Sequence, residues 1–350
     1  MARSRRTNAT AVRLRDIAQM AGVSVNTVSR ALNDKPDVSA DTRERVRGIA
    51  ERVGYSPNLL AKSLVSGLTQ TIGLVVTDCT DPYYAGLIRA VEDVASREGF
   101  GLLLATSNED PVKERWGLAL LTGRRVDGLL LTAVDVNAAH VRELLRGEVP
   151  VVLLSRRPRG YRGPFVGIDN VRGARAAVRH LFDLGHRRIA CIGRRGPASS
   201  ARDRLTGFRQ ELRACGLPGD PRALVHRAEP SVAGGRDAVP WLLGLDPRPT
   251  AVLTYNDAQA VGVIRGLQAA GLAVPGDVSV VGFDDIALAA LVHPPLTTVA
   301  QPIDEIGRRG AAALIQRIRQ GGAAMGRPLV LSSRLVVRES AGAPPPGAGG

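Results

Sequence analysis

Between Leu14 and Asn33, apolar residues recur at intervals of three and four positions on both sides of one short turn. This spacing matches the period of an α-helix and predicts two amphipathic helices whose apolar faces meet. Gly22 allows the tight turn, Val23 can close the angle between the helices, and Ser24 is a preferred N-cap for the second helix. The stretch predicts a helix-turn-helix, although a helical hairpin packed inside another kind of domain would show the same periodicity. The apolar positions are Leu14, Ile17, Ala18 and Ala21, followed by Val28, Ala31 and Leu32.

A third helix is indicated further along. Val38 and Ser39 form the staple and cap that open a helix, and Gly54 is a residue type that ends one. Its apolar face is expected to hold Val46, Ile49, Ala50 and Val53. The pattern of apolar and capping residues over 12–55 therefore predicts a small all-α bundle. Residues 1–11 form a polar, Arg-bearing arm that we expect to be disordered until it meets a partner, unless it is a disordered start of no consequence.

The pattern changes after Thr71, where short apolar runs alternate with amphipathic stretches. Continuous apolar runs are typical of buried parallel strands, and their alternation with helices predicts doubly wound sheets. Two such sheets in tandem predict a two-lobed α/β domain that binds its ligand beyond the carboxyl ends of the strands. The first set of runs is TIGLVV, GLLLAT, DGLLLT and PVVLLS, and the second is FVGID, RIACIG, ALVHR, TAVLTY and VSVVGF. The clearest helical stretches are 84–97, 171–184, 201–215 and 257–270.

Composition and charge narrow the possible partners. A chain of 350 residues, 44% of them apolar, can bury a substantial core and suggests two or three domains. Its net charge of +14 indicates a polyanionic partner, either nucleic acid or an acidic membrane surface. Residues 1–64 carry twelve Arg or Lys against six Asp or Glu, so the basic surplus includes the helical region.

Other features argue for a cytoplasmic protein that is not an enzyme. No apolar run approaches the ~20 residues that span a bilayer, and the N-terminus lacks the apolar core of a signal peptide. Cys79, Cys191 and Cys215 are isolated, which favours neither disulfides nor zinc. Motifs typical of hydrolases, phosphate loops, metalloproteases and dinucleotide binding are missing, so we expect no catalytic residue, metal or cofactor. Histidines such as His180 and His293 fit helix ends and loops.

The segment AGVSVNTVSRALN resembles the DNA-binding headpiece of the lactose-repressor (LacI/GalR) family of bacterial transcription regulators. VVGFDD and PPLTTVAQP carry the resemblance through the family's two-lobed, periplasmic-binding-protein-like effector domain as far as Arg338. This implies double-stranded DNA and a small-molecule effector as partners. The family usually has Ser or Thr where Arg13 stands, so the first helix is expected to be frayed or capped by water at that end.

In such a headpiece the second helix enters the major groove. The outward residues here would be Val25, Asn26, Thr27, Ser29 and Arg30. We expect Val25, Asn26 and Arg30 to contact base edges, whereas Thr27, Ser29 and the N-terminal arm hold phosphates.

Residues 55–64, YSPNLLAKSL, resemble the family's hinge. A helix this short is marginal in water, so it is expected to form only on DNA, where two copies lie in the minor groove. The resemblance assigns Leu64 to the wedge that kinks the duplex, with Lys62 nearby. Alternatively, Leu64 is an ordinary linker leucine packed on the next domain.

The resemblance also matches seven residues to a ligand cleft between the lobes. They are Tyr83, Tyr84, Ser155, Arg156, Arg204, Asn256 and Asp284. Together they offer donors and acceptors for sugar hydroxyls, and the tyrosines could stack on a ring or close the cleft mouth. Arg204 could instead pair with Asp203. Asn256 could cap the following helix, and Asp284 could satisfy a strand-end backbone. Many relatives carry an aromatic residue where Pro230 stands, which weakens the case for a ring stacked on that side.

The resemblance thus implies a regulator, most simply a repressor, that binds a near-palindromic operator as a homodimer and responds to a carbohydrate. A nucleobase or a partner protein as effector, a pocket that binds nothing, and a ligand-binding protein of the same two-lobed fold remain alternatives, and the sign of the effector response stays open. The expected boundaries are 56–68 for the hinge, 69–169 and 299–325 for the N-lobe, and 170–298 and 326–338 for the C-lobe. Residues 339–350 are expected to form a disordered tail without the heptads of a tetramer.

Overall fold

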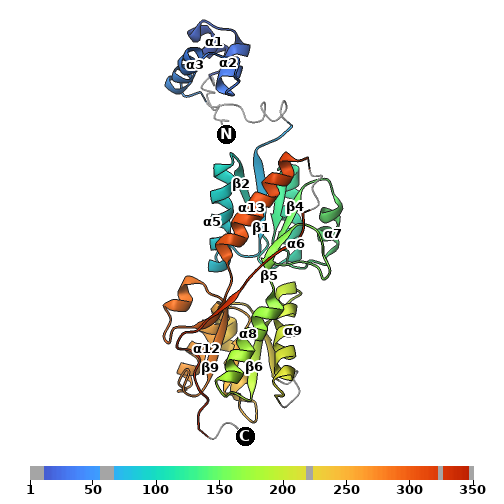
Figure 1. Cartoon of the computed structure of the whole chain (residues 1–350), viewed down its shortest axis with the longest axis vertical. Coiled ribbons are helices and arrows are strands. Elements are labelled where there is room, and N and C mark those ends of the chain that lie inside the picture. The colour runs from blue at the N-terminus through green and yellow to red at the C-terminus, as the bar shows by residue number, and fades with distance from the viewer. Residues whose placement is uncertain (1–11, 56–66, 218–223, 322–325, 347–350) are drawn as a thin grey trace, which may run out of the picture. The chain divides into compact units, whose positions relative to one another are not determined.

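The computed structural model describes residues 12–55, 67–217, 224–321 and 326–346. The chain divides into two compact units, Met1–Thr69 and Gln70–Gly350, which Figure 1 draws in blue and in light blue to red. The hinge residues Lys62 and Leu64 lie outside the described residues, as does the N-terminal arm.

The first unit is the predicted three-helix bundle. It consists of α1 (Leu14–Ala21), α2 (Val25–Leu32) and α3 (Ala40–Arg52). The apolar positions that repeat along the sequence meet in one core, so the helix-turn-helix prediction is confirmed. The core residues are Ile17, Ala18, Ala21, Val28, Ala31, Val38, Val46, Ile49 and Ala50.

Capping explains where these helices begin. The Ser24 hydroxyl accepts a hydrogen bond from the Thr27 N–H at 3.0 Å, which satisfies one of the free donors at the start of α2. Ser39 caps α3 in the same way. The Arg13 side chain offers no cap hydrogen bond to the start of α1, but the Asp16 carboxylate accepts from the Arg13 N–H at 2.8 Å, which is the reciprocal half of a capping box.

The second unit contains two six-stranded sheets with the same strand order. In each sheet the second strand of the lobe forms the edge beside the first strand, and the later strands follow on the other side of the first strand. In the N-lobe the order is β11-β5-β4-β3-β1-β2, and every pairing is parallel. Residues of β1 alternate between two cores: Ile72 and Leu74 pack with α5, whereas Val75 packs with α6. Helices α5 and α13 therefore cover one face, and α6 and α7 the other (Figure 1). The strands are β1 (Thr71–Val76), β2 (Gly101–Thr106), β3 (Gly128–Leu131), β4 (Val151–Leu154), β5 (Phe165–Ile168) and β11 (Leu329–Leu331); the helices are α5 (Pro82–Arg97), α6 (Pro111–Gly123), α7 (Ala139–Arg146) and α13 (Ile303–Arg319).

The C-lobe sheet has the order β12-β10-β9-β8-β6-β7, with only β12 antiparallel to its neighbour. Helices α8 and α9 pack on one face of this sheet and α10 to α12 on the other. The strands are β6 (Ile189–Arg194), β7 (Val225–Ala228), β8 (Ala251–Thr254), β9 (Ser279–Asp284), β10 (Thr297–Ala300) and β12 (Arg334–Val336); the helices are α8 (Asn170–Asp183), α9 (Ser199–Ala214), α10 (Val232–Asp237), α11 (Val239–Leu243), α12 (Asp257–Ala269) and the 3₁₀ helix η1 (Ala287–Ala290).

Three assignments from the sequence differ from the structure. The run FVGID, grouped with the second set of strands, forms β5 of the first sheet. Residues 329–331, expected in the C-lobe, pair with β5 as β11, and residues 299–300, expected in the N-lobe, belong to β10. The chain crosses between the lobes at these places, and apolar runs do not specify which sheet a strand joins.

The first part of the expected disordered tail is in fact hydrogen-bonded to the C-lobe, through Ser340 and Gly342. Ser340 is fully buried, and its hydroxyl accepts from the Thr297 N–H at 2.8 Å and donates to the Val280 carbonyl at 2.6 Å. Two residues on, the Gly342 carbonyl lies 2.9 Å from Nε2 of the buried His186. Paired backbone groups hold this segment in place despite its Pro- and Gly-rich composition.

Candidate functional site

A cavity of about 40 Å³ lies where the carboxyl ends of both sheets meet. All seven residues that the sequence assigned to the ligand cleft line it, although they come from positions as far apart as 83 and 284. The doubly wound topology explains this, because strand ends of parallel sheets share one edge. The lining residues are Asp81, Tyr83, Tyr84, Glu109, Ser155, Arg156, Ser200, Arg204, Pro230, Tyr255, Asn256, Asp284 and Gln301.

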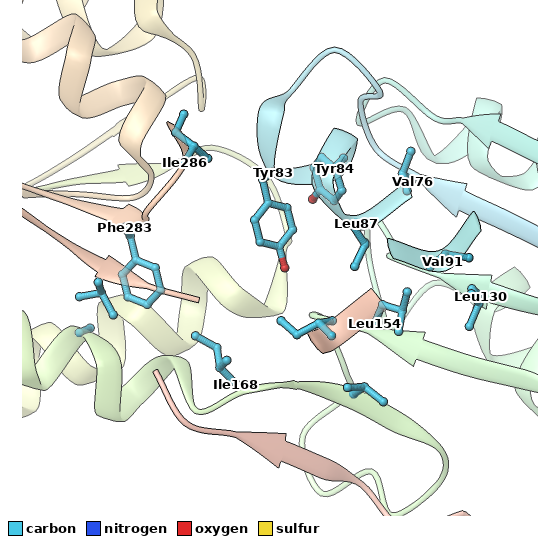
Figure 2. Close-up of a cluster of buried hydrophobic side chains, with 14 of the residues drawn as sticks. Val76, Tyr83, Tyr84, Leu87, Val91, Leu130, Leu154, Ile168, Phe283 and Ile286 are labelled. Carbon is cyan, nitrogen blue, oxygen red and sulfur yellow. The ribbon is translucent and has the colours of Figure 1, made fainter. Parts of the chain in front are cut away.

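The two tyrosines are buried at the start of α5 between the lobes. Figure 2 shows Tyr83 standing between Phe283 of the C-lobe and Leu87 of the N-lobe, with Tyr84 beside it. The Tyr83 hydroxyl lies 2.5 Å from Ser155 Oγ, and the two tyrosine rings meet edge to face. Ser155 has a left-handed backbone, with φ of 61°, which is strained for a residue with a Cβ. The tyrosines therefore form the apolar wall of the cavity.

Arg204 is the centre of the C-lobe side. Its Nε donates to Asn170 Oδ1 at 2.9 Å, and its Nη2 donates to Asp284 Oδ1 at 3.3 Å. Nη1 donates to the Tyr255 carbonyl. The guanidinium also lies 3.6 Å from the Phe283 ring centre. This fork is held rigidly, as a site that recognises hydroxyls or an anion requires.

Asp284 is an acid in an unfavourable environment. Burial raises its pKa to about 8, against the opposing attraction of Arg204. Gln301 Nε2 donates to the same carboxylate oxygen at 2.6 Å. The Asp284 backbone has φ of 127°, outside the region that residues with a side chain prefer. A carboxyl group with such a raised pKa is mostly protonated at neutral pH, so it can both donate and accept hydrogen bonds.

A second group of charges links the lobes. Glu109, which follows β2 of the N-lobe, lies 3.2 Å from Arg156 and forms an ion pair with Arg194 at the end of β6. Burial alone would raise the Glu109 pKa, but the two guanidiniums lower it. Both arginines are almost fully buried, so the pair is poorly screened by solvent. This ion pair favours the closed arrangement of the lobes.

The structural alternatives raised from the sequence have different outcomes. Arg204 does not pair with Asp203, whose carboxylate instead contacts Arg202 at 3.2 Å. Asn256 does cap α12, accepting from the Gln259 N–H at 2.9 Å, while its side chain still lines the cavity. Asn256 thus both caps a helix and lines the cavity.

Several lining residues were missed from the sequence. Glu109, Tyr255 and Gln301 each follow a strand within three residues, so the rule that ligands bind beyond strand ends could have identified them. Asp81 caps α5 and could have been found from its place before Pro82. Ser200, inside α9, carries no such signal.

The predicted DNA-contacting surface lies on α2. Val25, Asn26 and Arg30 are exposed, whereas Val28 and Ala31 on the opposite face are buried. Thr27 is partly engaged, since its hydroxyl lies 2.9 Å from that of Ser24. Arg30 Nη2 forms an ion pair of 2.5 Å with Asp37, and this guanidinium lowers the Asp37 pKa.

Comparison with known proteins agrees with both units. Residues 13–58 match the family model "Bacterial regulatory proteins, lacI family", and residues 178–341 match a periplasmic binding protein-like domain. The transcriptional regulator DegA of Bacillus subtilis is 35% identical over 93% of this chain and 96% of its own. The chain belongs to the LacI family of bacterial regulators.

Two further members of the family support the assignment. The ribose operon repressor of Escherichia coli K12 is 38% identical, over 88% of this chain and 93% of its own. A crystal structure of the Lac repressor dimer bound to operator and an anti-inducer matches with a TM-score of 0.86 at 29% identity, covering 95% of this chain and 100% of that one. As a member of this family, the protein is a sequence-specific DNA-binding transcriptional regulator.

The described residues contain neither a metal-binding cluster nor a membrane-spanning helix. Among them, no group of three or more His, Cys, Asp or Glu side chains is placed to hold a metal ion. No helix in the described ranges is long and apolar enough to cross a membrane.

Proposed function

We propose that the protein is a repressor that binds a near-palindromic operator as a homodimer and is controlled by a carbohydrate. The observation that carries the effector part is the convergence of Arg204, Asn256 and Asp284 on one cavity between two lobes. A guanidinium fork, an amide and a carboxyl group supply the donors and acceptors that vicinal hydroxyls need. The E. coli ribose operon repressor, a relative of similar length, is named for a sugar operon.

We propose that Val25, Asn26 and Arg30 contact base edges, because their side chains are exposed on α2. Thr27 and Ser29 are half-buried at the edge of that face, which suits contacts to phosphates. The hinge residues Lys62 and Leu64 complete the proposed DNA surface in the minor groove.

An exposed apolar surface supports the homodimer. Leu103, which lies on the α6 face of the edge strand β2, and Trp116 and Leu120 on α6 are 38%, 67% and 41% exposed. Clustered large apolar side chains beside an open sheet edge are typical of surfaces that a partner covers. A related repressor is a dimer on its operator, and we propose that a second copy of this chain covers this surface.

The cavity also indicates how an effector acts. At about 40 Å³ it is far smaller than the ~300 Å³ or more of typical small-molecule sites. A sugar therefore enters only if the lobes part or rotate, which strains the link between Glu109 and Arg194. We propose that this movement alters the spacing of the two hinge segments and so changes operator affinity. We also propose that the protein acts in the cytoplasm, where it would meet operator DNA, and we propose no catalytic activity for the cavity, since its relatives are regulators.

Calorimetric titration of the full-length protein with pentoses, hexoses and nucleobases tests this assignment. For the sugar that binds wild type, Arg204→Ala should weaken affinity by about 10- to 100-fold, because a charged hydrogen bond contributes about 1.5–3 kcal/mol. Arg213→Ala, at the exposed end of the same helix, serves as the control and should bind normally. Sugar affinity that is unchanged in Arg204→Ala would remove this residue from the binding site.

A further inference from the structure

A second, larger cavity of about 480 Å³ opens next to the first within the two-lobed unit. Its N-lobe wall is the loop from Ser155 to Phe165, and its C-lobe wall is the first turns of α8 and α9. Unlike the first cavity, its volume lies within the ~300–1,000 Å³ range of small-molecule sites. No residue in it has been used above to explain sugar recognition, apart from Ser155 and Asn170 at the shared border.

The charges that line this cavity are mostly positive. Four guanidiniums and two carboxylates face it, which leaves a surplus of two positive charges. They belong to Arg157, Arg159, Arg162 and Arg202, and to Asp169 and Asp203. Both carboxylates are already engaged: Asp203 contacts Arg202, and Asp169 accepts from the Arg172 N–H to cap α8.

The three arginines of the loop have no acidic partner within the described ranges. Arg157 is oriented instead by the Phe165 ring, with its guanidinium carbon 4.5 Å from the ring centre. Stacking of this kind holds the planar fork while leaving its N–H groups available. Arg159 and Arg162 are exposed in the same short loop, which also supplies the Tyr161 hydroxyl. Concentrated unpaired guanidiniums in a concave site are suited to a phosphate group.

We propose that this cavity binds a small metabolite that carries a phosphate group, as a second ligand distinct from the sugar in the first cavity. The phosphate would contact the loop guanidiniums, and the rest of the ligand would pack against Pro158 and Tyr161. Two charge-assisted hydrogen bonds from the loop guanidiniums to the phosphate would offset the surplus positive charge that lines the cavity.

The position of the cavity gives the second ligand a way to influence the first. The Arg157 N–H donates to Ser199 Oγ at 3.2 Å, which joins the N-lobe loop to α9. Asn170, at the border of the cavity, accepts from Nε of Arg204, the central residue of the sugar site. An anion bridging the loop and α9 therefore favours the closed lobes, and by linkage it changes sugar affinity as much as sugar changes anion affinity.

Pyrophosphate is a suitable probe because it has no sugar ring and so does not depend on the sugar proposal. Titrated into the full-length protein at constant ionic strength, it should bind wild type, and Arg159→Ala/Arg162→Ala should weaken binding by at least about tenfold. Arg213→Ala/Arg248→Ala removes two exposed arginines that do not line the cavity and is the charge-matched control, for which we expect wild-type affinity. Arg159→Lys/Arg162→Lys keeps the charge and should retain part of the affinity.

Two results would overturn the proposal. One is no binding of pyrophosphate to wild type. The other is equal binding to wild type and to Arg159→Ala/Arg162→Ala, which would place the anion elsewhere, such as on the basic headpiece. Melting temperatures without pyrophosphate should be the same for all variants, since the exchanged side chains are exposed, and this excludes misfolding as the cause of a loss. A protein that binds pyrophosphate in this way but no sugar would refute the sugar proposal alone.

Discussion

Asp284 combines three properties that each cost stability: a buried carboxyl group, a carboxylate neighbour in Asp257, and a left-handed backbone. Only the contacts with Arg204 and Gln301 offset them. Residues in such arrangements persist where function requires a fixed geometry, and this supports the assignment of Asp284 to the ligand site.

The raised pKa of Asp284 makes stability depend on pH. Between its ordinary value of 3.8 and about 8, the folded protein keeps a proton that the unfolded chain releases, so stability falls as pH rises through this window. The melting temperature of the two-lobed unit should therefore decrease from pH 6 to pH 8 in wild type, and this decrease should be smaller in Asp284→Asn. Asp246→Asn, an exposed exchange, should behave as wild type. The same slope in Asp284→Asn and wild type would contradict the assignment.

Arg30, which we propose contacts a base edge, is paired with Asp37 in the structure. Its ion pair with Asp37 is half-exposed, so it contributes little to stability and can be exchanged for a base at small cost. Replacement by Ala should reduce the discrimination between operator and random DNA by about 1–3 kcal/mol if the fork contacts a guanine. Arg45→Ala, on the exposed side of α3, is the control in gel-shift titrations on both sequences. Equal losses on operator and random DNA would identify Arg30 as a phosphate contact.

At this scale the residue types in the cleft could be predicted from the sequence, but their partners could not. All seven effector residues line one cavity, because each lies at a strand end or in the first two turns of a helix at the shared edge of the sheets. The pairing of Arg204 with Asp284 joins two residues 80 positions apart in the sequence. Asp203, the alternative partner considered from the sequence, is only the residue next to Arg204. The hydrogen bond between the Arg13 N–H and the Asp16 carboxylate was missed because its acceptor lies in the first turn of α1 and not at the cap position.

The positions of helices and strands along the chain were predicted more reliably than the elements that each one packs against. Hydrophobic patterning located the helices of the bundle and nine of the twelve described strands, since burial on one or both faces leaves a direct pattern in the sequence. It missed β10, β11 and β12. The sheet that β5 and β11 join depends on chain crossings that the pattern does not record. The C-terminal segment was misjudged because composition suggested disorder, while the buried Ser340 provides hydrogen bonds that order it.

The proposed hinge is the element on which we expect DNA bending to depend. Leu64→Ala should weaken operator binding and reduce the bend, because the smaller side chain cannot keep a base step unstacked. Leu64→Met retains an apolar side chain of similar size and should preserve most of both. Circular-permutation gel shifts with the full-length protein measure affinity and bend together. Wild-type affinity and bending in Leu64→Ala would show that it is a linker residue.

At the scale of the whole molecule, we propose that the hinge couples the two units. Sugar that enters the cavity would change the closure of the lobes, and the hinge would transmit this change to operator affinity. Reciprocity follows from linkage, so operator DNA must change sugar affinity by the same factor. Neither unit alone can show this behaviour.

The most direct test of the central claim is selection of binding sites from random duplex DNA by the purified full-length protein, repeated with a panel of sugars and nucleobases. The account predicts enrichment of a near-palindrome whose binding one sugar alters, which would also establish the sign of the response. Tight, salt-sensitive binding to all DNA without enrichment of any sequence would contradict it, because such binding reflects phosphate contacts alone.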